Sequence, residues 1–265
     1  MKTKAYAKVN IYLKITGTRG NFHIINSRFM RVDNLYDTIS FVEKEKAQDS
    51  FEIEGKFSCK KEQNIIYKAY KELTLIKNIS KKVENFFKHY KVSVEKSIPE
   101  FAGLGGGSSN AAAFLNLTNK TLSLKLDKKE LILISQKLGA DVAFFINEYE
   151  SANVSGVGEI VEKFPENVIK ISTLTPPIKC ETPLVYKRYR EILNQNYDKI
   201  IKNNRLLADK LQYMKSDEIL QNYDIFELND LYQAALDIYP KLKEYQKDNN
   251  FFSGSGSTFF KTRIL

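Results

Sequence analysis

A glycine- and serine-rich segment near the middle of the chain has the residue types of an anion-binding loop. Before it, residues 90–95 alternate between apolar and polar types, as expected for a half-buried strand. After it, residues 111–117 form an alanine-rich block that favours a helix, with Ser108 or Ser109 as the predicted N-cap. The loop includes Pro99, Gly103, Leu104, Gly105, Gly106, Gly107, Ser108 and Ser109. Such a loop directs unpaired N–H groups and the positive end of a helix dipole toward one point, which predicts a phosphate site.

The spacing of the glycines separates this loop from the common phosphate loops. A P-loop ends in Gly-Lys-Ser or Gly-Lys-Thr, and no lysine follows these glycines. Counted from Gly103, a dinucleotide fingerprint needs a glycine where this chain has Ser108. The His-Arg-Asp and Asp-Phe-Gly signatures of protein kinases are absent from the sequence. The segment is either a phosphate loop of another class or a flexible loop before an unrelated helix.

Two polar residues of the first predicted strand form a second candidate group. Residues 4–14 alternate strictly between apolar and polar types, so Lys8 and Asn10 project from the same side of that strand. This side could face solvent or a site. The pattern alone favours solvent.

Asp141 and His23 are two further residues whose side chains could take part in chemistry. Asp141 lies among apolar residues in the segment 139–145, where the commonest use of an aspartate is to cap a short helix. His23 follows Phe22 at the end of a turn signal, and a single loop histidine is usually a surface residue.

The elements that must position these residues change in character along the chain. The first part is rich in strands, at about 28–32, 38–42 and 51–53, followed by helices at 64–77 and 81–89. After the glycine loop, a helix over 128–138 ends at Gly139. The second half contains a strand at 168–174, helices at 183–194, 216–222 and 228–247, and two strand-like pieces around a Ser-Gly loop at 253–257. The pattern changes near residue 150, and no repeat or low-complexity linker marks the boundary.

Composition limits the class of protein. The 265 residues are 43% hydrophobic, which is enough for a sizeable core. No run approaches the roughly 18 to 20 apolar residues of a membrane span, and the start of the chain has no signal-peptide core, so a cytoplasmic protein is expected. Cys59 and Cys180 lack metal or disulfide spacing. The net charge of +9 comes from dispersed lysines, which are typical of a solvated surface and not of a nucleic-acid face.

The run Pro99 to Ala113 resembles the phosphate loop of the GHMP family of small-molecule kinases. The resemblance implies an α+β fold of two domains. An ATP-binding domain of the kind found in a ribosomal protein would span residues 1–152, and a ferredoxin-like α/β domain would span residues 153–265. The substrates would meet in the cleft between them.

Ordered motifs outside the loop narrow the resemblance to one branch of this family. These motifs are the Lys8 and Asn10 strand, Phe22-His23, Asn64-Ile-Ile-Tyr, Gly139-Ala-Asp-Val, Gly156-Val-Gly-Glu and Ser253-Gly-Ser-Gly. The branch phosphorylates the 2-hydroxyl of a cytidine diphosphate ester of methylerythritol, in the non-mevalonate route to isoprenoids. Two positions depart from its usual pattern. Gly20-Asn21-Phe22-His23 stands where Asp-Gly-Tyr-His is common, and Glu100-Phe101 stands where a Met-Gly pair is common.

The same resemblance implies a role for each candidate residue. Asp141 would be the general base, and Lys8 would hold the attacking hydroxyl and favour the ionised carboxylate. The glycine loop would wrap the triphosphate of ATP, with Ser108 near Mg²⁺. The remaining implied contacts are adenine with Asn64, Lys96 and Ser97, and the cytidylyl substrate with Asn10, Phe22, His23, Asp141 and Tyr186. A monomer or weak homodimer is expected, with no nucleic-acid or membrane partner.

Two other functions stay open at this point. Another kinase of the same superfamily would keep Lys8, Asp141 and the loop, but it would not need aromatic residues around a base. A basic nucleic-acid-binding module would have an affinity that falls steeply with salt, and it would have no use for Asp141.

Overall fold

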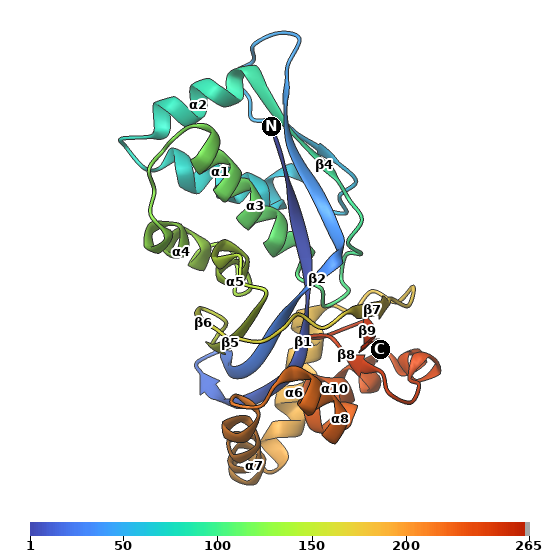
Figure 1. Cartoon of the computed structure of the whole chain (residues 1–265). Coiled ribbons are helices and arrows are strands. Elements are labelled where there is room, and N and C mark those ends of the chain that lie inside the picture. Colours follow the sequence, from blue (N-terminus) through green and yellow to red (C-terminus); the bar gives the residue numbers. More distant parts are fainter. Residues whose placement is uncertain (263–265) are drawn as a thin grey trace. The chain divides into compact units, whose positions relative to one another are not determined.

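A computed structural model describes residues 1–262 of the chain (Figure 1). These residues form two compact units, each assembled from segments that are far apart in the sequence. Unit 1 contains residues 1–7, 34–98 and 106–148, and unit 2 contains residues 8–33, 99–105 and 149 onward. The chain therefore passes from unit 2 to unit 1 inside the glycine loop, between Gly105 and Gly106. The predicted boundary between residues 152 and 153 stays a prediction.

Unit 1 consists of short helices and one end of a sheet. Within it, the distal half of β2 (Phe22–Glu43) pairs antiparallel with β4 (Tyr90–Glu95), and β4 pairs parallel with β3 (Ile53–Gly55). The helical elements are η1 (Lys61–Gln63), α1 (Ile65–Thr74), α2 (Ser80–His89), α3 (Gly106–Thr121), α4 (Lys128–Gln136) and α5 (Val142–Asn147). α3 packs against both α1 and α5, and α5 also packs against α4.

Polar caps and an aromatic cluster explain why the helices of unit 1 form where they do. Asn64 caps α1 by accepting from the backbone N–H of Ile66 at 2.9 Å. Asp127 and Glu130 form a reciprocal capping box at the start of α4. The core beneath these helices contains the interlocking rings of Phe41, Phe51, Phe87 and Phe114.

Unit 2 is built on the strand β1 (Lys2–Arg19), which pairs with β2 through a tight hairpin at Gly20 and Asn21. Gly20 has φ +57°, a conformation that glycine adopts without strain. β2 also pairs with β5 (Ser151–Gly156), which pairs with β6 (Ile160–Lys163). A second sheet has the order β7 (Ile171–Leu174), β9 (Phe259–Thr262), β8 (Phe251–Phe252). The helical elements of unit 2 are α6 (Thr182–Gln195), α7 (Tyr197–Leu211), α8 (Ser216–Asn222), α9 (Ile225–Leu228), α10 (Leu231–Ile238) and η2 (Pro240–Tyr245).

Both faces of β1 are buried, so the predicted solvent face of this strand is wrong. Lys8, Asn10 and Lys14 are each less than 5% exposed. Lys14 donates to the Asp230 carboxylate and, at 2.8 Å, to the Glu227 carbonyl. Burial raises the pKa of Asp230, and Lys14 opposes that rise. The alternation in the sequence identified the strand correctly, but its polar face packs against distant parts of the chain, and Lys14 contacts residues 213 and 216 positions away.

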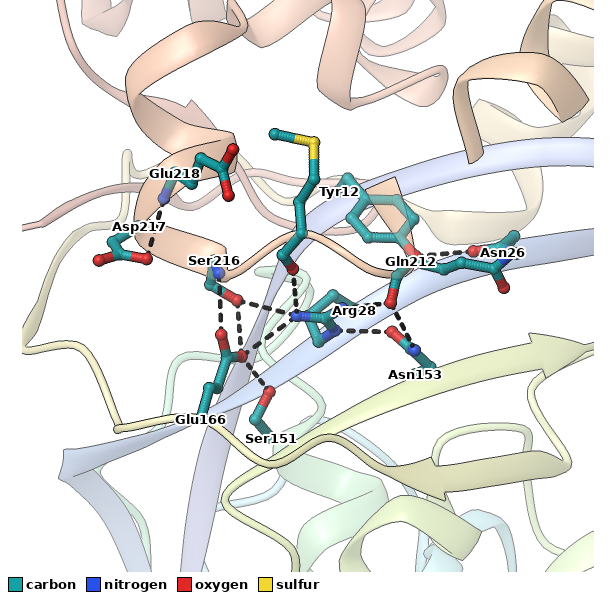
Figure 2. A network of polar contacts seen from close by, with 11 residues as sticks. Tyr12, Asn26, Arg28, Ser151, Asn153, Glu166, Gln212, Ser216, Asp217 and Glu218 are labelled. Carbon is teal, nitrogen blue, oxygen red and sulfur yellow. Dashed lines mark hydrogen bonds and ion pairs between the residues drawn. The ribbon is translucent and has the colours of Figure 1, made fainter. Parts of the chain in front are cut away.

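A second buried ion pair in unit 2 joins Arg28 of β2 to Glu166 (Figure 2). Arg28 is fully buried, and its guanidinium donates to Glu166 at 3.3 Å, to Asn153 at 2.6 Å and to the Gln212 carbonyl at 3.0 Å. Its charge also lies 3.3 Å from the centre of the Phe164 ring. One side chain thus joins β2 to β5 and to two loops that have no regular structure.

Several element boundaries differ from the sequence predictions. The helix after the glycine loop begins at Gly106, so Ser108 and Ser109 lie inside its first turn and neither is its N-cap. The strands predicted at 28–32 and 38–42 are one continuous strand, β2. The single helix predicted at 228–247 is divided, because Pro240 cannot continue α10 and a 3₁₀ turn follows. The α+β class is confirmed.

Two further observations concern the class of protein. None of the helices in residues 1–262 is long and apolar enough to cross a membrane. Cys59 is exposed, Cys180 is buried, and both are free thiols.

Candidate functional site

The ammonium group of Lys8 is held by an amide and a carbonyl in unit 2. Lys8 Nζ donates to Asn10 Oδ1 at 2.7 Å and to the Gly103 carbonyl at 3.2 Å. It also lies 4.5 Å from the centre of the Phe29 ring, at a cation–π distance. The Asn10 amide in turn donates to Ser27 Oγ at 2.9 Å. The structure therefore brings the predicted residues Lys8, Asn10 and Gly103 together.

Gly103 is placed by close contact with the C-terminal Ser-Gly loop. A Cβ atom at Gly103 would lie 2.0 Å from the Ser253 carbonyl oxygen, and its φ is +73°, so only glycine fits. The Ser253 hydroxyl donates to the Gly103 carbonyl at 2.9 Å, beside the Lys8 contact. Leu104 accepts from the Lys8 backbone N–H at 3.0 Å. The first half of the glycine loop is thereby fixed to β1.

The second half of the glycine loop forms the first turn of α3 in unit 1. Gly105 has φ +69°, which lets the chain turn directly into the helix at Gly106. A Cβ at Gly106 would lie 2.9 Å from the Ile98 side chain, whereas Gly107 is exposed and has only Ile65 nearby, at 3.7 Å. No acidic residue lies in this first turn, so its positive dipole end is not neutralised from within.

Asp141 lies close to the start of α3 within unit 1. A Cβ atom on Gly139, two residues before it, would be 3.8 Å from Ser108 Oγ. Asp141 occupies the N-cap position of α5, which the sequence favoured, but this half-buried carboxylate does not form the capping hydrogen bond.

The segment that enters the glycine loop is held by Asp37. This carboxylate is fully buried on β2, and Oδ1 accepts from the backbone N–H groups of Ser97 at 2.7 Å and Ile98 at 2.8 Å. Its other oxygen pairs with Lys96 Nζ. The Lys96 charge is thus neutralised by Asp37, and Ser97 is exposed.

His23 meets two tyrosines of α6 in unit 2. Its ring centre lies 5.1 Å from that of Tyr186 and 6.0 Å from that of Tyr189, and Arg190 donates to the Asn21 carbonyl at 2.9 Å. His23 is only 8% exposed, yet its Nε2 has no hydrogen-bond partner within residues 1–262. Burial, followed by the charge of Arg190, lowers the pKa of His23 to about 4, so the ring is neutral at pH 7.

Phe22 is exposed, whereas its neighbour His23 is buried. The Phe22 side chain is 66% exposed at the start of β2, beside the hairpin turn. The predicted domains 1–152 and 153–265 place Phe22 and Tyr186 in different domains, whereas both residues belong to unit 2.

Two polar residues of these clusters were not singled out by the sequence, and a third, Ser253, was noted only as part of a motif. Ser27 and Asp37 sit within β2, where their neighbours give no sign of their burial. Ser253 lies in a Ser-Gly motif whose glycines predict a loop but do not predict its partner.

Comparison with known proteins identifies the family of this chain. The family model for the GHMP kinase N-terminal domain matches residues 64–148. A protein of Sulfurimonas denitrificans is 49% identical over 98% of this chain and 96% of its own length, and it is named 4-diphosphocytidyl-2-C-methyl-D-erythritol kinase. A Helicobacter pylori protein of the same name is 36% identical over 98% of this chain and 93% of its own length. The chain belongs to this kinase family.

Solved structures show the same fold. A crystal structure of a 4-(cytidine 5'-diphospho)-2C-methyl-D-erythritol kinase covers the whole chain with a TM-score of 0.71 at 24% identity, and the match includes 90% of that protein. A mevalonate kinase structure matches 99% of this chain and 91% of its own with a TM-score of 0.65 at 14% identity. The predicted GHMP kinase fold is confirmed. Membership of the 4-diphosphocytidyl-2-C-methyl-D-erythritol kinase family makes the Lys8, His23 and Asp141 clusters the places to look for substrate contacts.

Proposed function

We propose that this chain transfers the γ-phosphoryl group of ATP to the 2-hydroxyl of 4-diphosphocytidyl-2-C-methyl-D-erythritol, in the non-mevalonate route to isoprenoids. Family membership supports the activity, and the cluster around Lys8 is the structural observation that carries it. A buried ammonium with fixed partners is suited to holding an oxygen that gains negative charge. In this proposal the enzyme works in the cytoplasm.

Asp141 takes the proton of the 2-hydroxyl, and Lys8 orients that oxygen. Phosphoryl transfer through a loose transition state asks the protein mainly for positioning and charge neutralisation. The position of Asp141 at the start of α5, in the segment whose Gly139 approaches Ser108 of the glycine loop, supports its role as the base. Asn10 contributes to substrate binding, since its amide is fixed beside Lys8.

The glycine loop binds the triphosphate, and the segment around Lys96 and Ser97 binds the adenine. The uncompensated N-terminus of α3 and the open surface at Gly107 support the phosphate site. Pro99 and Leu104 shape the phosphate site through the backbone, and Asn64, whose side chain caps α1, is the third proposed residue of the adenine site. ATP phosphates would carry Mg²⁺, which binds proteins through few ligands, and the Ser108 hydroxyl is the proposed protein ligand. Within residues 1–262 no group of three His, Cys, Asp or Glu residues could hold a metal alone.

The cytosine ring binds beside His23. Its unpartnered Nε2, the adjacent Tyr186 ring and the exposed Phe22 ring support a site that combines a hydrogen bond with stacking. Stacking of a base on an aromatic side chain is worth about 1 to 3 kcal/mol for any base. Discrimination of cytosine must therefore come from hydrogen bonds such as those of His23.

An ADP-release assay tests the activity. The cytidylyl substrate is expected to support turnover, while mevalonate, homoserine and galactose are not. Asp141→Asn is expected to lower kcat by about 10² to 10⁴ with little change in substrate affinity, because a base acts on the transition state. Glu148→Gln, which changes an exposed carboxylate at the other end of α5, is the matched control. Near-native turnover of Asp141→Asn would contradict its role.

A nucleotide titration tests the base site separately. With an ATP analogue present, the protein is expected to bind CMP more tightly than UMP or AMP, and His23→Ala is expected to lose that preference. Equal affinity of the wild type for CMP and UMP would refute the cytosine site. Affinity for single-stranded RNA that falls steeply with salt would instead favour a nucleic-acid function.

A further inference from the structure

Ser27 is a fully buried serine on β2 whose hydroxyl faces β1. Its Oγ accepts from Asn10 Nδ2 at 2.9 Å and donates to the backbone carbonyl of Tyr12. Phe29, two residues along β2, lies on the same side of the strand and contacts Lys8. Ser27 thus belongs to the surroundings of Lys8 without touching its ammonium.

The donors and acceptors in this group allow only one arrangement. The Tyr12 carbonyl can only accept, so the Ser27 hydroxyl must use its single proton there. The Ser27 oxygen is then an acceptor, which fixes the NH₂ group of Asn10 toward it. Asn10 must therefore present Oδ1 to Lys8, whose ammonium can only donate.

We propose that Ser27 is a positioning residue that locks the Asn10 amide with its oxygen toward Lys8. Without the Ser27 hydroxyl, the Asn10 amide loses the partner that fixes its orientation, and its NH₂ group can turn toward the Lys8 ammonium. Two donors would then face each other, and Lys8 would lose the acceptor that lies 2.7 Å from its ammonium. The consequence for turnover rests on the proposed function of Lys8 and Asn10, but the orientation of the amide does not.

The kinetic test is a double-mutant cycle on Ser27 and Asn10. Ser27→Ala is expected to lower kcat about tenfold, the equivalent of one hydrogen bond, with KM for ATP changed less than about twofold. Adding Ser27→Ala to Asn10→Ala is expected to lower kcat no further, because Ser27 acts through Asn10. Ser27→Thr keeps the hydroxyl and is expected to restore most of the turnover.

A spectroscopic measurement tests whether Ser27 fixes the Asn10 amide, and it does not depend on enzyme activity. The side-chain amide signals of Asn10, assigned by their loss in Asn10→Ala, are expected to show slow exchange with water in the wild type. In Ser27→Ala the exchange is expected to be faster. Ser40→Ala removes a half-buried hydroxyl further along β2 and is the matched control for both tests. If Ser27→Ala does not fold, Ser27→Cys takes its place, because a thiol is a weak donor and acceptor.

The outcomes separate this proposal from the proposed function. Unchanged Asn10 amide exchange in Ser27→Ala, or a double variant whose two kcat losses multiply, would overturn the role of Ser27. An inactive wild type with the cytidylyl substrate would overturn the proposed function, and the amide exchange would still decide the role of Ser27.

Discussion

Phe101 holds a backbone conformation that suits glycine. Its φ is +56°, in the left-handed region, and its side chain is 47% exposed. A left-handed conformation costs a residue with a side chain roughly 1 to 2 kcal/mol. The family's usual glycine at this place would avoid that strain, so the departure seen in the sequence has a physical cost at the entrance of the glycine loop.

Phe101→Gly is therefore expected to stabilise the protein. The relief of strain exceeds the entropy that glycine adds to the unfolded chain, and the net gain is expected to be about 0.5 to 1 kcal/mol. The measurement is the free energy of unfolding in urea. Phe22→Gly, which changes an exposed phenylalanine in an extended strand, is the matched control and is expected to destabilise by about 0.5 to 1 kcal/mol. A loss of stability in Phe101→Gly would contradict the strain.

The candidate residues were easier to find from the sequence than the surroundings in which they lie. The glycine spacing and the motif containing Asp141 depend on local geometry, so they can be read from neighbouring residues. The burial of Lys8 depends on Gly103, and that of Ser27 on β1. Asp33 and Asp37 look alike in the sequence, yet one is exposed and the other is fully buried. Such differences arise from contacts that no local pattern encodes.

At the scale of elements, Asp37 connects β2 to the start of the glycine loop. It satisfies two consecutive backbone N–H groups and an ammonium from the segment 96–98. These residues follow β4 directly and have no strand partner of their own. The Asp37 carboxylate therefore satisfies the backbone N–H groups of this segment, as sheet pairing does in β4. The proposed adenine site depends on this carboxylate.

Asp37→Asn is expected to weaken ATP binding more than turnover. The amide keeps one oxygen for Ser97 and Ile98, but its NH₂ group faces the Lys96 ammonium, so the loop loses its second anchor. We expect KM for ATP to rise about tenfold, the equivalent of one charged hydrogen bond, while kcat changes less than about twofold. Steady-state kinetics with varied ATP provide the measurement. Asp33→Asn is the control, and an equal KM for both variants would contradict the anchoring role.

Some boundaries of elements are set by a single residue. The turn at Gly20 was predicted, and it follows from the backbone freedom of glycine. Pro240 ends the helical segment that includes α10, and the prediction of one helix over 228–247 overlooked it. The start of α3 was placed too late, because glycine disfavours helix interiors and Gly106 and Gly107 nevertheless form its first turn. Tertiary contacts, such as that of Gly106 with Ile98, override propensity there.

At the scale of the whole molecule, the stability of unit 2 depends on its buried charges. Glu166 accepts from Ser216 and Ser151 in addition to Arg28, so both ions of the pair are fully hydrogen-bonded (Figure 2). Burial lowers the pKa of Arg28, and Glu166 opposes this shift. A loop around Glu166 and another around Gln212 are attached to the sheet by this guanidinium and also by Ser151 and Asn153 of β5.

Removal of one partner of this pair is expected to destabilise the protein strongly. Arg28→Met leaves the Glu166 carboxylate buried without its cation, which should cost about 3 to 5 kcal/mol, while Arg31→Met, in a partly exposed pair, should cost about 1 kcal/mol or less. The double variant Arg28→Met/Glu166→Gln removes both charges of the pair. Its loss of stability is expected to be smaller than the sum of the losses in Arg28→Met and in Glu166→Gln. Urea unfolding of the variants gives each free energy. Additive losses would show that the two charges do not depend on each other, and the loops would then be held by their other contacts.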